Sequence, residues 1–238
     1  MTGANTGIGQ GIALAIARAG GTVIGIGRSS MEETAGLVEG QGGTFVAVKG
    51  DIADSKASVA LLEEMMAEAP LDGLVNNAGI IRRADAVDFT EEDWDQVMDV
   101  NLRSLFFLCQ AYGRSCMARG RAGRIVNIAS LLSFQGGIRV SSYTASKHGV
   151  LGITRLLANE WAAKGINVNV IAPGYIETNN TEALRNDPDR SRAILDRIPA
   201  GRWGEARDIG DAAVFLLSEA SRYMHGAVLP VDGGWLAR

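Results

Sequence analysis

The chain has little cysteine, little histidine and no long uninterrupted apolar run. Two of its 238 residues are cysteines, Cys109 and Cys116, and two are histidines, so the composition favours neither a disulfide framework nor a metal site. No signal-peptide pattern and no apolar run of about 18 residues is found, which argues against secretion and against membrane spanning. The expected compartment is therefore the reducing cytoplasm.

Charge of one sign is also scarce. The formal net charge is −4, with 23 basic and 27 acidic side chains, so no broad basic surface is expected and nucleic acid is not an expected partner. Hydrophobic residues make up 47% of the chain and charged residues 21%, as in ordinary globular proteins. This length and composition fit one large α/β domain over residues 1–238.

Short β-branched runs alternate with amphipathic helical patterns along the whole chain. Such alternation predicts a single-domain, Rossmann-type, doubly wound parallel sheet covered by helices on both faces. The expected strands are Thr22–Gly27, Thr44–Lys49, Asp72–Asn76, Gly123–Ala129, Ile166–Ile171 and Gly226–Val231. The expected helices are Gln10–Ala19, Ser30–Glu39, Ser55–Glu68, Glu91–Met117 with a break near Asn101, Ser141–Lys164 and Arg207–Ser218.

A glycine-rich turn leads into the first helix. Gly3, Gly7 and Gly9 have the spacing G-x-x-x-G-x-G, which lets the backbone turn tightly and bring helical N–H groups to a pyrophosphate. Such a loop normally follows the central strand of the sheet, and here it follows Met1. We therefore expect the first strand to be missing from this sequence and the natural polypeptide to begin earlier.

Tyr143 and Lys147 are four residues apart in an expected helix, so they share one face. A tyrosine hydroxyl has a pKa near ~10, and a neighbouring cation brings it toward the range of a general acid or base. Ser130 follows the expected strand Gly123–Ala129, and its hydroxyl could donate to a carbonyl oxygen beside the phenol. The alternative for the pair alone is a solvated Lys beside a half-buried Tyr.

Together these pieces resemble the short-chain dehydrogenase/reductase family over essentially the whole chain. The matching motifs are Thr2-Gly3-x-x-x-Gly7-x-Gly9, Asn76-Asn77-Ala78-Gly79, Asn101, Ser130, Tyr143-x-x-x-Lys147 and Pro173-Gly174. The resemblance implies that Tyr143 donates or accepts the proton, Ser130 polarises the carbonyl, and Lys147 lowers the pKa of Tyr143 and binds the nicotinamide ribose. It also implies that Asn101 holds a water in a proton relay, and that the protein is a homotetramer packed through its long helices.

The resemblance further implies a dinucleotide site built from several loops. Its expected residues are Gly3, Asn5, Gly7, Ile8, Gly9, Arg28, Ser29, Asp51, Ile52, Asn77, Ala78, Gly79, Tyr143, Lys147, Pro173, Gly174, Ile176 and Thr178. At the end of the second strand, Gly27 occupies the position where NAD-specific proteins carry an acidic residue, and Arg28 follows it. Nothing there repels a 2′-phosphate, so NADP(H) is the favoured cofactor and NAD(H) a possible one. The alternative is that Arg28 only stacks on the adenine.

Other segments, including Leu132–Val140 and Val231–Arg238, resemble the branch of the family that acts on small acidic sugars of the 2-deoxy-D-gluconate or 2-dehydro-3-deoxy-D-gluconate type. A sugar carboxylate calls for a planar cation or several polar donors. Arg82, Gln135 and Arg139 are the expected substrate residues, with Arg83 and Arg202 as further candidates for the carboxylate. The alternatives are a reductase of another carbonyl, such as a 3-oxoacyl thioester, and a non-catalytic NADP-binding sensor.

Overall fold

The computed structural model describes residues 1–238, apart from the side chain of Asn180. Its strands are β1 (Val23–Gly27), β2 (Phe45–Lys49), β3 (Gly73–Asn76), β4 (Gly123–Ile128), β5 (Ile166–Pro173) and β6 (Val228–Val231). Its α-helices are α1 (Gly7–Arg18), α2 (Glu32–Glu39), α3 (Ser55–Glu68), α4 (Glu91–Met98), α5 (Ser104–Ala118), α6 (Ser141–Trp161), α7 (Glu182–Arg185), α8 (Pro188–Leu195) and α9 (Ala206–Leu217).

The strands pair in parallel, in the order β2–β1 and β3–β4–β5–β6. The first two residues of the chain lie between these two groups. Thr2 forms parallel bridges with both Ile26 of β1 and Asn76 of β3, the Thr2 N–H donates to the Val75 carbonyl at 3.0 Å, and the Ile26 N–H donates to the Met1 carbonyl at 2.8 Å. The doubly wound parallel α/β fold is thus confirmed, and Met1 and Thr2 occupy the position of its central strand.

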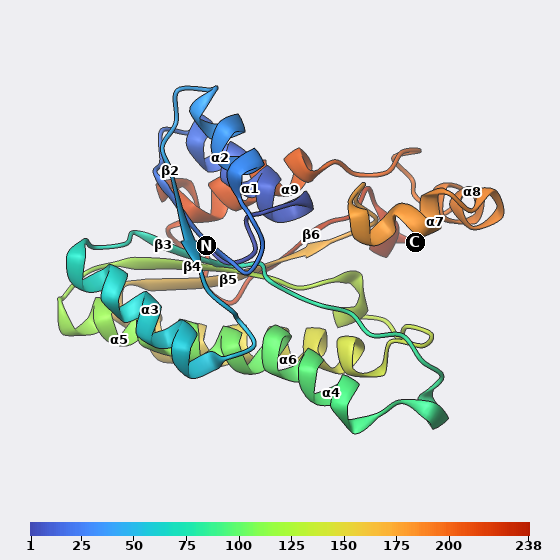
Figure 1. The fold of residues 1–238 in the computed structure, drawn as a ribbon, viewed down its shortest axis with the longest axis horizontal. Helices are drawn as coiled ribbons and strands as arrows, with labels where there is room; N and C mark the ends of the chain where they lie inside the picture. The colour runs from blue at the N-terminus through green and yellow to red at the C-terminus, as the bar shows by residue number, and fades with distance from the viewer.

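Helices cover both faces of the sheet (Figure 1), with α1, α2 and α9 on one face and α3 to α6 on the other. All eight residues of β5 are buried, because a parallel strand inside such a sandwich packs on both faces. Helices α1 and α9 approach closely, since a methyl group at Gly210 would lie 2.5 Å from the Gly11 carbonyl oxygen. Among the described residues no helix is long and apolar enough to cross a membrane.

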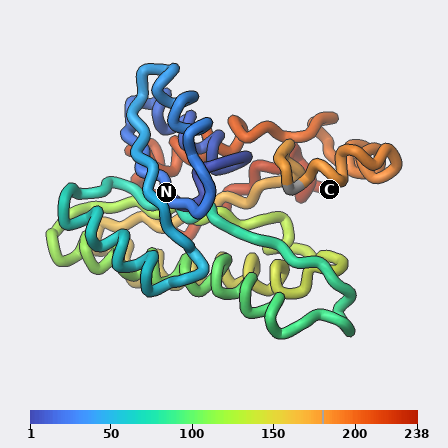
Figure 2. The backbone as a smooth tube through the Cα atoms, viewed as in Figure 1, coloured from blue at the N-terminus to red at the C-terminus, as the bar shows by residue number. Residues whose placement is uncertain are grey.

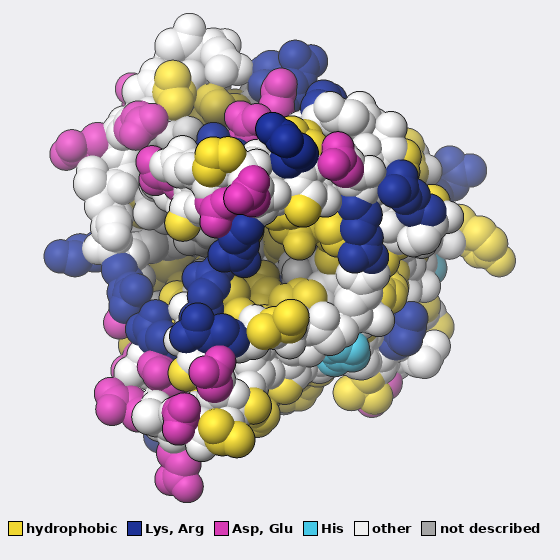
Figure 3. Space-filling view, turned by 90° about the vertical axis from the view of Figure 1, so that its right-hand side faces the viewer, with side chains coloured by type: hydrophobic (Ala, Val, Ile, Leu, Met, Phe, Trp, Pro, Cys, Tyr) yellow, Lys and Arg dark blue, Asp and Glu magenta, His cyan; other side chains and the backbone are white. Residues whose placement is uncertain are grey.

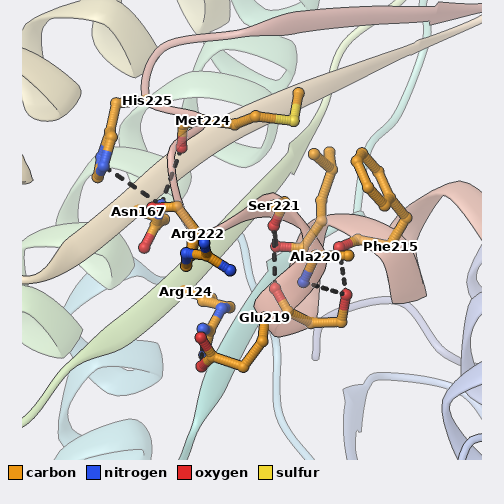
Figure 4. Close-up of polar contacts among 11 residues, drawn as sticks. Arg124, Asn167, Phe215, Glu219, Ala220, Ser221, Arg222, Met224 and His225 are labelled. Atoms are coloured by element: carbon orange, nitrogen blue, oxygen red, sulfur yellow. Dashed lines mark hydrogen bonds and ion pairs between the residues drawn. The ribbon is translucent and has the colours of Figure 1, made fainter.

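Polar side chains tie the amino edge of β4 and β5 to the segment before β6 (Figure 4). The Asn167 amide donates to the main-chain carbonyls of Arg222 and Met224 at 3.1 and 2.9 Å, and His225 lies beside it. Arg124 forms an ion pair with Glu219 on the same edge. These contacts tie the start of β4 and β5 to the segment before β6, although the Arg124 Nε and the His225 Nδ1 have no hydrogen-bond partner among the described residues.

The helical layer agrees with the sequence-based expectation at one point and differs from it at another. The predicted break near Asn101 is a π-helical turn, Asp99–Arg103, that joins α4 to α5. The sequence analysis missed α7 and α8, which lie with the carboxyl terminus at one end of the molecule (Figures 1 and 2). The signal for α8 was present, since the Asp187 side chain caps its first N–H groups and Pro188 is its first residue.

Candidate active site

Loops at the carboxyl ends of the parallel strands form one face of the molecule. Figure 3 shows this face hollowed near its centre, with hydrophobic side chains on the walls and Lys and Arg side chains gathered along one side. Ser130 lies two residues after the end of β4, and Tyr143 and Lys147 lie in the first two turns of α6. Ligands of open α/β sheets bind outside this edge, so the predicted catalytic residues lie where the fold places chemistry.

Tyr143 is half-buried at the start of α6. Burial raises the pKa of its phenol, while the Ser130 hydroxyl and the positive charge of Arg83 lower it. The Ser130 oxygen also accepts from the Leu132 N–H at 3.2 Å, which fixes the turn that carries it. Ser130 and Arg83 therefore both favour the phenolate form of Tyr143, and the expected hydrogen bond from Ser130 to a carbonyl oxygen of the substrate stays a prediction.

Lys147 is buried beside Tyr143, with its Nζ 5.6 Å from the centroid of the phenol ring. The ammonium donates to the Ile128 carbonyl at 2.7 Å, and burial lowers its pKa to about 8. The sequence analysis expected Lys147 to lower the pKa of Tyr143. That role stays a prediction, because in this structure Nζ donates to the Ile128 carbonyl at the end of β4 and the groups that lower the pKa of Tyr143 are Ser130 and Arg83.

Asn101 lies in the π-helical turn and is buried. Its side-chain oxygen accepts from the Ile80 N–H at 2.9 Å, and its amide donates to the Ile80 carbonyl at 2.9 Å and to the Ser146 hydroxyl at 3.2 Å. These bonds hold the loop after β3 against α6. Asn101 therefore fixes the position of Ile80 relative to Ser146, which precedes Lys147 in α6. Its role in a water relay stays a prediction.

The glycine-rich loop is hydrogen-bonded to the loop that follows β3. The Thr2 hydroxyl accepts from the N–H groups of Asn77 and Ala78 at 3.1 and 3.0 Å, and the Asn77 amide donates to the Gly3 carbonyl at 2.9 Å. The first N–H groups of α1 receive no side-chain cap from Thr6. The loop therefore fits a pyrophosphate, whose oxygens would accept from these uncapped donors.

We expect Gly9→Ala to lower the free energy of unfolding by about 1–3 kcal/mol or more and to weaken NADPH binding about tenfold or more. The added methyl group would lie 1.8 Å from the Gly3 carbonyl oxygen, so the loop could not keep its shape. Thermal melting and a fluorescence titration measure the two effects. As a control, Gly36→Ala places a methyl in open space on α2 and is expected to stabilise by about 0.5–1 kcal/mol with unchanged affinity. Equal behaviour of the two variants would contradict this account.

The adenosine end of the site lies between the ends of β1 and β2. Arg28 is exposed, and its Nε is 3.9 Å from a carboxylate oxygen of Asp51, a separation that leaves the guanidinium free to rearrange. Ser29 is exposed beside it. Ile52 is buried, and its carbonyl accepts from the Ser104 hydroxyl at 2.5 Å. Arg28, Asp51 and Ile52, which were predicted to contact the adenosine, thus lie together after the carboxyl ends of β1 and β2.

The loop after β5 closes the other end of the dinucleotide site. Gly174 is packed so tightly that a methyl group there would lie 2.5 Å from the Cα of Asp232. Ile176 is buried, and the side chain of Thr178 reaches the glycine-rich loop, since a methyl group at Gly7 would lie 3.1 Å from its Cγ2. Ile176 and Thr178 therefore lie beside the start of α1, and their contact with the nicotinamide stays a prediction.

Each of the three expected substrate residues has a partner within the protein, and their contact with a substrate stays a prediction. Arg82 binds Gln96 at 2.8 Å and Asp93 at 3.2 Å on α4. Arg139, at a φ of 63°, has its Nε 3.1 Å from Asp85, and Gln135 accepts a hydrogen bond from the Trp235 indole at 3.1 Å. Arg202, the further candidate, binds both carboxylate oxygens of Asp208.

Arg83 differs from these arginines. It is exposed like Arg139 and Arg202, but its positive charge also lowers the pKa of Tyr143. The sequence analysis named Arg83 only as one of several candidates, because neighbouring arginines in a loop cannot be ranked without their partners.

A doubly wound parallel sheet with a glycine-lined helix start and a Ser, Tyr and Lys set at one edge defines an NAD(P)-dependent dehydrogenase or reductase. A family model described as enoyl-(acyl carrier protein) reductase matches residues 3–236. The chain belongs to the short-chain dehydrogenase/reductase family, as its motifs indicated.

Individual relatives match over the full chain. This chain is 56% identical to the 2-dehydro-3-deoxy-D-gluconate 5-dehydrogenase of Bacillus subtilis (strain 168) and 55% identical to that of Dickeya dadantii (strain 3937). Each match covers 100% of this chain and 94% of the relative. The crystal structure of a candidate 2-deoxy-D-gluconate 3-dehydrogenase from Agrobacterium tumefaciens, solved with bound NADP, is 62% identical. It superposes with a TM-score of 0.96 over 100% of this chain and 95% of that one.

Proposed function

We propose that this chain is an NADP(H)-dependent oxidoreductase that interconverts a hydroxyl and a keto group on a small acidic sugar of the 2-dehydro-3-deoxy-D-gluconate or 2-deoxy-D-gluconate type. The observation that carries the proposal is the placement of Ser130, Tyr143 and Lys147 at the carboxyl edge of the sheet, after β4 and at the start of α6. Relatives that act on such sugar acids, by name, support the substrate class.

When bound, NADP(H) supplies the hydride donor or acceptor. In the reductive direction, Tyr143 gives its phenolic proton to the carbonyl oxygen of the sugar, and Ser130 donates a hydrogen bond to the same oxygen. In the oxidative direction, the Tyr143 phenolate takes the proton of the sugar hydroxyl. Lys147 faces the phenol and would hold the nicotinamide ribose. Asn101 fixes the position of Ile80 relative to Ser146.

The proposal is tested by assaying the protein with hexonates and keto-deoxy uronates against both nicotinamide cofactors, with a 3-oxoacyl thioester as the competing substrate class. We expect turnover of the sugar acids and little of the thioester. A thioester turned over faster than every sugar acid would overturn the proposal.

Arg83 is the residue that we assign to the sugar carboxylate. We expect Arg83→Ala to raise the KM for the sugar acid by about 10–100-fold, because a charged hydrogen-bond partner of the carboxylate is lost. Binding of NADPH should remain unchanged. Arg82→Ala is the matched control, since that guanidinium is held by Asp93 and Gln96. A larger effect at Arg82 than at Arg83 would reverse the assignment.

Arg28 is the residue that we assign to the 2′-phosphate of NADP(H). We expect Arg28→Ala to weaken NADPH binding by about 1–3 kcal/mol, the cost of a lost charged hydrogen bond, and to leave NADH binding nearly unchanged. Fluorescence titration with both cofactors measures this. Equal losses would leave only stacking on adenine, and a wild-type preference for NADH would contradict the cofactor assignment.

We also propose a homotetramer in the cytoplasm. Large apolar side chains are partly exposed on the long helices, with Trp94 40%, Phe107 39% and Leu156 50% exposed on α4, α5 and α6. Burying such side chains against a second copy would remove apolar surface from water. The buried cysteines, Cys109 and Cys116, fit a reducing compartment. Analytical ultracentrifugation tests the assembly.

A further inference from the structure

Three loops of the active-site face meet at Trp235, in the last turn of the chain. The indole is 6% exposed. Its ring centroid lies 4.7 Å from that of Tyr175 in the loop after β5, and 3.9 Å from the guanidinium carbon of Arg197, just beyond α8. Its Nε1 donates to the Gln135 side chain at 3.1 Å. One side chain thus contacts the loop after β5, the segment that follows α8, and the loop after Ser130.

The turn that carries Ser130 is held on two sides. On one side, the Ser133 hydroxyl donates to the Lys147 carbonyl of α6 at 2.7 Å. On the other side, Gln135 is bound by the indole, and Leu131 packs in one buried cluster with Trp235 and Ile198. The position of the Ser130 hydroxyl relative to Tyr143 therefore depends on the carboxyl-terminal turn as well as on α6.

A cavity beside Tyr175 makes the contact between Trp235 and the loop after β5 more important. A cavity of about 210 Å³ is lined by Tyr175, Ile198, Arg202 and Asp208, among other residues. The Tyr175 ring meets Trp203 edge-on at 5.5 Å and Trp235 at 4.7 Å. Because the cavity leaves part of this loop without packing partners, loss of the Trp235 contact would give the loop room to move.

We propose that Trp235 is a positioning residue that fixes the relative positions of the Ser130 turn, the Tyr175 loop and the segment after α8. The indole acts through Gln135 and through packing, without touching the reacting atoms. The inference rests on the proposed function for its kinetic consequence, but the ordering of the Ser130 turn follows from the contacts alone.

The test uses Trp235→Phe, which keeps a ring and deletes the N–H, and Gln135→Leu, which deletes the acceptor. Each variant should lower kcat/KM for the sugar acid about fivefold, the loss expected for one hydrogen bond. The double variant should lose no more than either single one, because both remove the same bond. Gln135→Glu keeps an acceptor and should restore most of the activity. NADPH affinity should stay within about twofold of wild type in all of them.

Hydrogen exchange gives a readout that needs no substrate. Amides of residues 132–135 should exchange about fivefold faster in both single variants. Trp161→Phe is the matched control, because Trp161 is also 6% exposed but packs against Gly113 in the core. The proposal is overturned if Trp235→Phe behaves like Trp161→Phe in exchange and kinetics, or if the two single losses add. A wild-type protein inactive on sugar acids would sink the proposed function and leave the exchange test intact.

Discussion

Replacing Tyr143 by Phe is expected to lower kcat by at least about 10²-fold, with the fold and the NADPH affinity intact. The substitution keeps the ring and removes only the hydroxyl that gives or takes the proton. The phenol is tuned by opposing influences, since burial raises its pKa while Ser130 and Arg83 lower it. No other tyrosine in the described residues of the site, including Tyr175 with its aromatic contacts to Trp203 and Trp235, is placed to replace it.

Single-turnover kinetics with saturating NADPH measure the effect on the chemical step. Tyr112→Phe is the matched control, because it deletes a buried tyrosine hydroxyl that donates to the Leu71 carbonyl at 3.2 Å. That control should lose about 1 kcal/mol of stability and keep its kcat. Turnover like wild type in Tyr143→Phe would refute the assignment of the acid–base group.

Lys147→Met is expected to lower kcat by about 10²-fold and to stabilise the protein at neutral pH. Burial lowers the pKa of Lys147 from 10.5 to about 8, so folding at pH 7 buries a charge at a cost of roughly 3 kcal/mol. The Met variant avoids this cost, but it also loses the hydrogen bond to the Ile128 carbonyl, which lowers its stability by about 1 kcal/mol. The net gain for the Met variant at pH 7 is therefore about 2 kcal/mol.

The gain has a defined pH dependence. Below pH 8 the ammonium is charged in both the folded and the unfolded state, and the full cost of burial is present. Between pH 8 and 10.5 only the unfolded state holds the proton, so the stability of the wild type rises toward that of the variant. Urea unfolding at pH 7 and pH 10 measures this convergence. A difference that stays constant with pH would mean that Lys147 is not a buried charge.

The same variant separates two roles of Lys147 in catalysis. If its ammonium tunes Tyr143 once the cofactor is bound, the alkaline limb of the kcat profile should move upward in pH when the charge is removed. If Lys147 serves only to bind ribose, the profile should keep its position while NADPH affinity falls. The structure favours neither outcome, because the Lys147 ammonium donates to the Ile128 carbonyl.

The placement of Ser130, Tyr143 and Lys147 could be predicted from the sequence because it depends on local structure. Tyr143 and Lys147 share a helix face by their spacing, and Ser130 ends a strand whose neighbours must share its carboxyl edge. The glycine spacing before α1 follows from backbone sterics, because a methyl group added at Gly9 would lie 1.8 Å from the Gly3 carbonyl oxygen. Strand bounds were right within a few residues for the same reason, since periodicity is a property of each segment.

Partner choice among long polar side chains was decided by the tertiary structure. Arg82 and Arg139 carry the kind of side chain that binds a carboxylate, but in the folded chain they pair with Asp93 and Asp85. Arg83 is the arginine whose charge acts on Tyr143. Gln135 meets Trp235, 100 residues away in the chain. Sequence by itself determines which residues can do the chemistry, because helix and strand periods are local. Only the packed structure decides which of them remain unpaired at the site, because charge pairing depends on distances between segments that meet after folding.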